Sequence, residues 1–215
     1  MFMVYGFPNS RSSRVVWALE EVGAEYECVH VDLRAGAGWR PEYLALNAGG
    51  KVPTLVDGEF VLTESGAICT YIGDRFPATG LTPPVGGQER ARYNQWCYFA
   101  LSELEQPLWT IGKHTFALPE RRRAPAVLET ARWEFSVAAK ILAEGLGRHE
   151  FIVGDRFTAA DILIAHTLAW AQAFELPLEH DNLESYTTRL LARPAWLRVQ
   201  EREREQAEAK VETRA

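Results

Sequence analysis

The chain has 215 residues, 47% of them hydrophobic, and a formal net charge of -6 with a sequence pI near 5.5. This apolar content supports a folded core and excludes a disordered chain, and the acidic balance argues against nucleic acid as the main partner, because phosphate binding requires a basic face. The sequence shows no secretory signal and no stretch of the roughly 18 apolar residues that a membrane span needs, so we expect a cytoplasmic protein with no membrane partner.

Apolar periodicity in the first third of the chain predicts a small mixed sheet with helices on both faces. The expected elements are, in order, strand 2–6, helix 15–22, strand 26–31, strand 52–56, strand 59–62 and helix 64–75. The strand–helix–strand unit implies parallel strands with a right-handed crossover, and Asp57-Gly58 between two apolar runs is typical of a β-hairpin. The order βαβ followed by ββα is the thioredoxin-like arrangement.

The composition changes after Pro77, where Pro, Gly and Thr indicate a linker and only helical periods follow. The expected helices are 88–115, 120–145, 158–173 and 183–203. The sequence therefore predicts an α/β plus all-α fold: a thioredoxin-like domain at 1–78, a linker at 79–87, an all-helical domain at 88–203 and a charged tail at 204–215.

The three cysteines, Cys28, Cys69 and Cys97, are far apart and form no C-x-x-C motif. This spacing is not that of a metal site or a redox motif, so no metal is expected. Because each cysteine lies in an apolar pattern, we expect three buried free thiols in a reducing compartment. A redox sensor that uses one of these thiols is an alternative, and accessibility to a thiol reagent would test it.

Three hydroxyls, Ser10, Ser12 and Ser13, stand at the start of the first predicted helix. A helix N-terminus presents unpaired N–H groups and the positive end of the helix dipole. Each serine is therefore open to two interpretations: it caps the helix, or it donates a hydrogen bond to a bound thiolate and lowers the pKa of that thiol.

Three further features of the first domain point to a small anionic peptide thiol. Pro53 begins a strand, and a cis Val52–Pro53 bond would turn the backbone of Val52 outward to pair with an extended ligand. Ser65 either caps the next helix or binds a carboxylate, and the adjacent Glu64 suits an ammonium group. Lys51 is either a surface lysine or a cation for a second carboxylate.

Four segments, in this order, resemble the glutathione transferase family. They are Asn47-Ala-Gly-Gly-Lys51-Val-Pro53-Thr-Leu55, Thr63-Glu-Ser65-Gly-Ala-Ile68, Phe157-Thr158-Ala-Ala-Asp161-Ile and Arg193-Pro-Ala-Trp196. The first loop has no tyrosine after Tyr5 and no cysteine, which makes the chain most similar to the serine-type theta, delta and phi groups and their bacterial relatives. In the third segment Thr158 and Asp161 predict a capping box, which is a folding element and not a catalytic site.

The resemblance implies a cytoplasmic, homodimeric detoxification enzyme that binds glutathione as co-substrate and directs its thiolate at a hydrophobic electrophile. It implies Ser10 as the active-site hydroxyl, with Ser12 and Ser13 as alternatives. The glutathione contacts that it implies are Val52 and Pro53 for the cysteinyl unit, Glu64 and Ser65 for the γ-glutamyl end, and Lys51 for the glycine carboxylate. Arg40 stands near the place of a histidine in many serine-type members and is expected to replace it.

The second-substrate pocket is expected between the domains. Its candidate residues, each also open to a core interpretation, are Phe7, Trp39, Tyr98, Trp109, His114 and Phe116. The dimer interface is expected at the helix after Ser65 and at helix 88–115, where Tyr93, Trp96 and Tyr98 lie close together. The sequence does not name the co-substrate or the reaction subtype, since one fold hosts many functions. A glutathione-binding or protein-interaction module without turnover is the alternative function.

Overall fold

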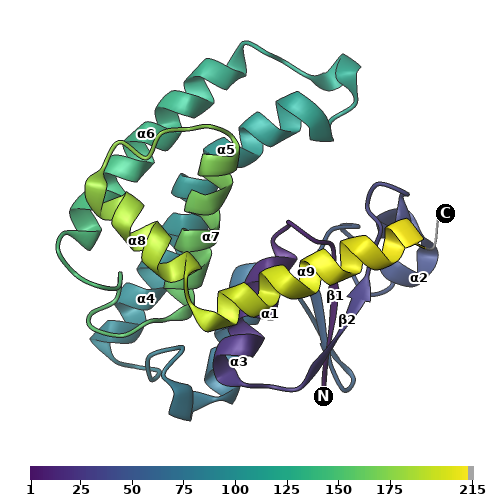
Figure 1. Cartoon of the computed structure of the whole chain (residues 1–215), viewed down its shortest axis with the longest axis horizontal. Helices are drawn as coiled ribbons and strands as arrows, with labels where there is room; N and C mark the ends of the chain where they lie inside the picture. The colour runs from purple at the N-terminus through teal and green to yellow at the C-terminus, as the bar shows by residue number, and fades with distance from the viewer. Residues whose placement is uncertain (213–215) are drawn as a thin grey trace. The chain divides into compact units, whose positions relative to one another are not determined.

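A computed structural model describes residues 1–212 of the chain. The chain divides into two compact units, each described here by itself: a sheet unit, made of Met1–Thr82 with the described residues from Ala192 onward, and a helical unit, Pro83–Leu191. Figure 1 shows the elements of both units. Part of the predicted charged tail, residues 213–215, lies outside the described residues. The predicted limits of the domains and the linker stay predictions.

The sheet unit contains four strands. They are β1 (Phe2–Gly6), β2 (Tyr26–His30), β3 (Thr54–Asp57) and β4 (Phe60–Thr63). Their order across the sheet is β2-β1-β3-β4. β1 pairs in parallel with β2 and antiparallel with β3, and β3 and β4 form the antiparallel hairpin. The predicted βαβ-ββα order of a thioredoxin-like domain is confirmed.

Helices cover both faces of this sheet. α1 (Ser12–Val22) and α3 (Ser65–Arg75) pack together, α1 against β1 and α3 against β4, and Val4 and Leu55, partners in β1 and β3, are buried. α1 ends, as predicted, at Gly23, whose φ of 65° is a left-handed conformation that glycine adopts without strain. Because side chains alternate along a strand, Tyr5 faces the other side of the sheet, where its ring meets Tyr43 of the short helix α2 (Pro41–Leu44) at 6.0 Å.

The last helix of the chain also packs in the sheet unit. α9 (Pro194–Glu212) lies alongside α1 (Figure 1), and the rings of Trp17 and Trp196 are 4.7 Å apart between them. The predicted single helix 183–203 is wrong, because the structure has two helices, α8 (Asp181–Leu191) and α9, with a break before Pro194. Proline has no N–H to donate and is favoured at the first position of a helix, so it separates the two.

The helical unit contains only helices and loops in the described structure. Its elements are α4 (Gln88–Phe99), a π-helical turn (Ala100–Leu104), α5 (Glu105–Gly112), a second π-helical turn (Lys113–Ala117), a 3-10 turn (Glu120–Arg122), α6 (Val127–Leu146), α7 (Ala159–Ala173) and α8. The predicted helix 88–115 thus appears as one helical run with two π turns. The predicted start at 120 is wrong for α6, because the backbone is extended at Arg123, next to Ala124-Pro125, and α6 begins only at Val127.

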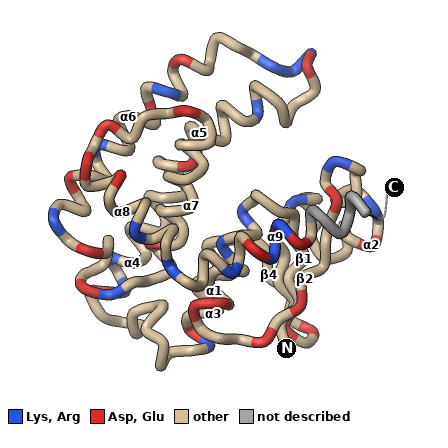
Figure 2. The backbone as a smooth tube through the Cα atoms, viewed as in Figure 1, with Lys and Arg blue, Asp and Glu red and all other residues tan. Residues whose placement is uncertain are grey.

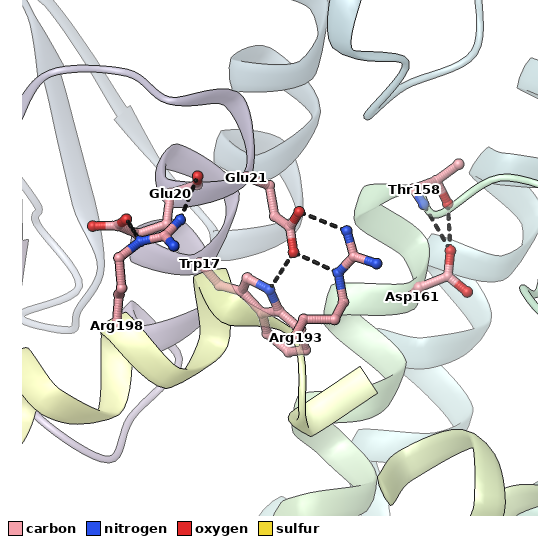
Figure 3. Close-up of polar contacts among 7 residues, drawn as sticks. All are labelled: Trp17, Glu20, Glu21, Thr158, Asp161, Arg193 and Arg198. Carbon is pink, nitrogen blue, oxygen red and sulfur yellow. Dashed lines mark hydrogen bonds and ion pairs between the residues drawn. The ribbon is translucent and has the colours of Figure 1, made fainter. Parts of the chain in front are cut away.

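The start of α7 has the capping box that the sequence predicts. The carboxylate of Asp161 accepts hydrogen bonds from the Thr158 N–H (2.8 Å), the Thr158 hydroxyl (3.0 Å), the Ile152 N–H (2.9 Å) and the Tyr186 hydroxyl (2.7 Å). Figure 3 shows the pair of bonds from Thr158. Burial raises the pKa of Asp161, while these four donors act in the opposite direction. Asp161 is fully buried and fully engaged in holding the fold.

Candidate functional site

The first loop of the sheet unit positions Ser10 at the start of α1. The Ser10 Oγ accepts a hydrogen bond from the Ser12 N–H (3.2 Å) and donates to the Phe7 carbonyl oxygen (2.6 Å). It also lies 3.0 Å from the Ser12 Oγ. Asn9, directly before it, has a left-handed φ of 53°. Ser10 therefore accepts the first N–H of α1, lies just before the N-cap residue Arg11, and remains partly exposed.

The other two serines of the loop are buried and engaged within the protein. Ser12 is 4% exposed, and its Oγ accepts a hydrogen bond from the Phe7 N–H (3.3 Å). Ser13 is 1% exposed, and its Oγ donates to the carboxylate of Glu203 (2.6 Å). Ser10 is thus the most exposed of the three candidate hydroxyls.

The start of β3 packs beside the first loop. Val52 is buried in a cluster with Val31 and Tyr43, and Phe7 of the first loop packs against that cluster. The Val52–Pro53 peptide bond is cis, as the sequence analysis anticipated. The Lys51 carbonyl oxygen accepts a hydrogen bond from the Tyr43 hydroxyl (2.6 Å), while the Lys51 side chain is exposed.

The segment that carries Trp39 and Arg40 is fixed against the residues before β3. A Cβ atom on Gly38 would lie 2.3 Å from the Gly50 carbonyl oxygen, so only glycine permits this approach. Trp39 is 70% exposed, and Arg40 is exposed beside it. The exposed cations Arg40 and Lys51 therefore extend from two segments in close contact.

The turn between β4 and α3 places Glu64 and Ser65 at a second helix N-terminus. Glu64 has φ 68° and ψ 113°, a conformation that is strained for any residue with a side chain and is found preferentially at functional sites. Ser65 is buried, and its Oγ lies 3.4 Å from Nη1 of Arg14. The guanidinium of Arg14 is fully buried. A buried cation and two helix N-termini, those of α1 and α3, favour an anionic ligand in this part of the sheet unit.

The remaining pocket candidates lie in the helical unit. Trp109 contacts the ring of Trp170 at 6.4 Å, Trp170 contacts Phe174 at 5.6 Å, and Phe116 contacts Phe174 at 6.4 Å. Sequence reasoning missed Trp170 and Phe174, because both continue the apolar period of α7 and resemble core residues. This aromatic cluster joins two of the predicted residues to two that were not predicted.

The other two candidates of the helical unit lie apart from these ring contacts. The Nδ1 of His114 accepts a hydrogen bond from the Ala124 N–H (3.0 Å), which gives His114 a structural role in the loop before α6. Tyr98 is 70% exposed on α4.

A small pocket in the sheet unit lies where the first loop, the ends of β1 and β2, and α9 meet. Its lining includes Phe7, Pro8, Ser12, His30, Arg202 and Glu203. Its volume of about 30 Å³ is far below the roughly 300–1,000 Å³ usual for a small-molecule site. We therefore do not assign it to glutathione. Glu203 was missed from the sequence because alternating charges in this helix indicated a solvated face.

The prediction of three buried cysteines is wrong for one of them. Cys69 and Cys97 are buried, and burial raises the pKa of Cys97 to about 12. Cys28 is exposed, because β2 is an edge strand. Within residues 1–212, no group of three or more His, Cys, Asp or Glu side chains could hold a metal ion, and none of the described helices is long and apolar enough to cross a membrane.

Comparisons with known proteins agree with this geometry. Residues 1–74 match the model of the glutathione S-transferase N-terminal domain, and residues 106–194 match that of the C-terminal domain. The chain is 30% identical to glutathione S-transferase 3 of Zea mays, with 90% of each chain covered, and 31% identical to glutathione S-transferase 1 of Triticum aestivum, with 91% and 92% covered.

A solved structure gives the same result for the fold. The crystal structure of a glutathione transferase from Methylococcus capsulatus has a TM-score of 0.84 and 29% identity to this chain, covering 94% of this chain and 98% of that one. The family models cover both units, and the relatives extend over nearly the whole chain. On these grounds the chain belongs to the glutathione S-transferase family.

Proposed function

We propose that this family member is a glutathione transferase in which the Ser10 hydroxyl, when glutathione binds, turns from the Phe7 carbonyl oxygen and donates its one hydrogen bond to the glutathione thiolate. The observation that carries the proposal is the contrast among the three serines: Ser10 is partly exposed at the N-terminus of α1, whereas Ser12 and Ser13 are buried. A hydroxyl donor and the helix dipole both favour the anion, so the pKa of the bound thiol falls below the ordinary value of about 8.5.

The two ends of the peptide are held by the flanking segments. The backbone before β3 pairs with the cysteinyl unit through two hydrogen bonds of Val52, and Pro53 fixes that segment. Glu64 binds the γ-glutamyl ammonium, and Ser65 with the first N–H groups of α3 binds its carboxylate, close to the buried charge of Arg14. The exposed cations Lys51 and Arg40 bind the glycine carboxylate.

With a carbon electrophile, the chemistry is a substitution or addition by sulfur. The thiol proton leaves to solvent, the thiolate electron pair forms a bond to the electrophilic carbon, and in a substitution the leaving group departs with its own electron pair. The protein contributes stabilisation of the anion and proximity of the two reactants. No covalent bond to the enzyme is required.

The aromatic residues supply the hydrophobic surface for the second substrate. Trp109 and Phe116, joined by ring contacts through Trp170 and Phe174, present this surface from the helical unit. Phe116 is 60% exposed. Phe7, Trp39, Tyr98 and His114 stay candidates for the same substrate. Exposed aromatic side chains favour an apolar, planar electrophile.

The protein acts as a homodimer in this proposal. β4 exposes Phe60 and Val61, and α4 exposes Tyr98. Tyr93, one of the residues from which the interface was predicted, is fully buried in the helical unit. Sedimentation at micromolar concentration tests the dimer, and a monomer there contradicts it.

A thiolate titration combined with a co-substrate panel tests the proposed function. Ultraviolet absorbance of bound glutathione is followed against pH, and turnover is measured with a haloarene, an organic peroxide, an aryl ether and a maleyl ester. We expect a bound thiol pKa of about 6.5–7 and turnover with at least one of the four. Glutathione binding with an unshifted thiol pKa and no turnover would instead support the alternative, a binding module without catalysis.

A further inference from the structure

Glu203 connects the last helix of the chain to the loop that carries Ser10. Its carboxylate accepts a hydrogen bond from the Ser13 hydroxyl (2.6 Å) and another from the backbone N–H of Asn9. Asn9 directly precedes Ser10 and holds a left-handed φ of 53°, a region that asparagine enters more readily than most residues other than glycine. The two donors therefore lie on either side of Ser10, and one acceptor fixes both.

The rest of α9 fixes where this carboxylate lies. Arg193 donates two hydrogen bonds to the carboxylate of Glu21 (2.7 and 2.8 Å), and Arg198 and Arg202 pair with Glu20. The pairs of Arg193 and Arg198 are drawn in Figure 3. Figure 2 shows how closely the charges of both signs follow one another along α9.

Apolar packing adds to these ion pairs. Val199 is fully buried, and Trp196 packs on Trp17. Arg193, just before α9, pairs with Glu21 near the end of α1, and Glu203 pairs with Ser13 near its start, so α9 runs antiparallel to α1. The ten residues from Pro194 to Glu203 make about 15 Å of helix.

We propose that Glu203 is a positioning residue that holds the loop 9–13 so that the Ser10 hydroxyl is presented to the glutathione thiol. The inference rests on the proposed function of Ser10. Glu203 itself does not touch glutathione in this proposal. It acts through Ser13 and Asn9, and it makes α9 part of the thiolate-binding apparatus.

The charge of Glu203 opposes part of this effect. A carboxylate near the thiolate site disfavours a second negative charge there. Burial raises the pKa of Glu203, and its two donors act in the opposite direction. Arg202, beside it on α9, and Cys28 of β2 line the same small pocket. Positioning and charge therefore predict opposite results when Glu203 is replaced, which makes them separable by experiment.

The test uses the full chain with three substitutions: Glu203→Ala, Glu203→Gln and Glu201→Ala. Glu203→Ala removes both the acceptor and the charge, whereas Glu203→Gln removes the charge and keeps one acceptor oxygen. Glu201→Ala is the matched control, because Glu201 is an exposed residue of the same helix. Each protein is measured by ultraviolet titration of bound glutathione, by glutathione affinity and by amide hydrogen exchange of residues 7–13.

For Glu203→Ala we expect the pKa of the bound thiol to rise by about one unit and the glutathione dissociation constant to change less than about threefold. In the same variant, amide hydrogen exchange of residues 7–13 becomes faster. In all three measurements Glu203→Gln lies closer to the wild type than Glu203→Ala does, and Glu201→Ala matches the wild type. A thiol pKa that falls in both Glu203 variants would show that the charge dominates and would overturn the proposal.

Unchanged exchange in Glu203→Ala would also overturn the proposal. The exchange measurement needs no ligand, so it is informative even when glutathione does not bind. A wild-type protein that does not bind glutathione would contradict the proposed function. Even then, faster amide exchange in Glu203→Ala than in the wild type would show that Glu203 holds the loop.

Discussion

Two helix N-termini of this chain are held by carboxylates that lie at very different distances along the sequence. At α7 the carboxylate is Asp161, three residues after Thr158, to whose N–H and hydroxyl it is bonded. At α1 the carboxylate is Glu203, which is 190 residues from Ser13. The first interaction forms within one turn of a helix, whereas the second requires α9 to be docked on α1. The comparison therefore separates Asp161, which holds the fold, from Glu203, which we propose positions the loop of the site.

The largest expected effect is at the local interaction. Asp161→Ala leaves four buried donors without their acceptor, and we expect a loss of at least about 3 kcal/mol in the free energy of unfolding. Urea unfolding measures it, with Asp181→Ala as control, because Asp181 is an exposed acidic residue in the first turn of α8. A loss below about 1 kcal/mol would show that the carboxylate does not hold the fold.

The next largest effect is on the rate of the proposed reaction, at the start of α1. Ser10→Ala removes the proposed donor to the thiolate, and we expect a loss of about 1.5–3 kcal/mol in transition-state stabilisation, roughly ten- to a hundredfold in rate. The bound thiol pKa rises, and glutathione affinity falls less because other groups hold the peptide ends. The variant also loses the acceptor of the Ser12 N–H at the start of α1, about 1 kcal/mol of stability, so assays are run at a temperature where it is folded.

Ser12→Ala and Ser13→Ala serve as comparisons for Ser10→Ala. If only one of these two moves the thiolate titration, the donor is a different serine and the mechanism stands. If none of the three moves it, the hydroxyls are caps and backbone N–H groups alone stabilise the thiolate.

A third N-terminus, that of α3, sharpens the comparison between local and long-range interactions. Ser65 is contacted by Arg14 from α1, so it also depends on tertiary packing. Ser65→Ala is expected to weaken glutathione binding by roughly 1–3 kcal/mol, because a bound carboxylate loses a donor. Titration calorimetry measures it, with Thr70→Ala on the same helix as control, since the Thr70 hydroxyl donates one turn back, to the Gly66 carbonyl oxygen. Equal affinities in Ser65→Ala and the wild type would reject this role.

The same distinction explains which elements the sequence predicts. Residues 2–6 form β1 as predicted, and Thr158 with Asp161 forms the capping box, because both depend on patterns within a few residues. Gly23 ends α1 for the same reason. Where a proline intervenes, as at Pro194, periodicity alone misplaces the boundary, because the apolar pattern continues through the break.

The candidate site is less predictable than the fold. The partial exposure of Ser10 and the burial of Ser12 depend on how the first loop turns back on β1, and neighbouring serines in a sequence do not differ in this respect. Glu203 lies in a run of alternating charges, and the sequence does not show which of them contacts the loop. The packing of α9 on α1 decides this. Trp170 and Phe174 were missed because α7 is apolar on all sides. Tertiary contacts decide each of these cases.

The smallest expected effect concerns the far end of α9. Arg193 makes a two-bond pair with Glu21, whose side chain is 13% exposed while that of Arg193 is 30% exposed. Because the pair is partly solvated, Arg193→Ala is expected to cost only about 1 kcal/mol in the free energy of unfolding. Arg193→Lys is expected to recover somewhat less than half of that loss, since lysine keeps the positive charge but cannot make both hydrogen bonds of the guanidinium. The matched control is Arg204→Ala, an exposed arginine of the same helix whose guanidinium bonds the Gln200 carbonyl oxygen one turn back. The bound thiol pKa should stay unchanged, because Trp196, Val199 and Arg198 still hold α9 on α1. A loss above about 3 kcal/mol, or a shifted thiol pKa, would mean instead that α9 docks as one cooperative unit and that the Glu203 contact depends on every anchor along it.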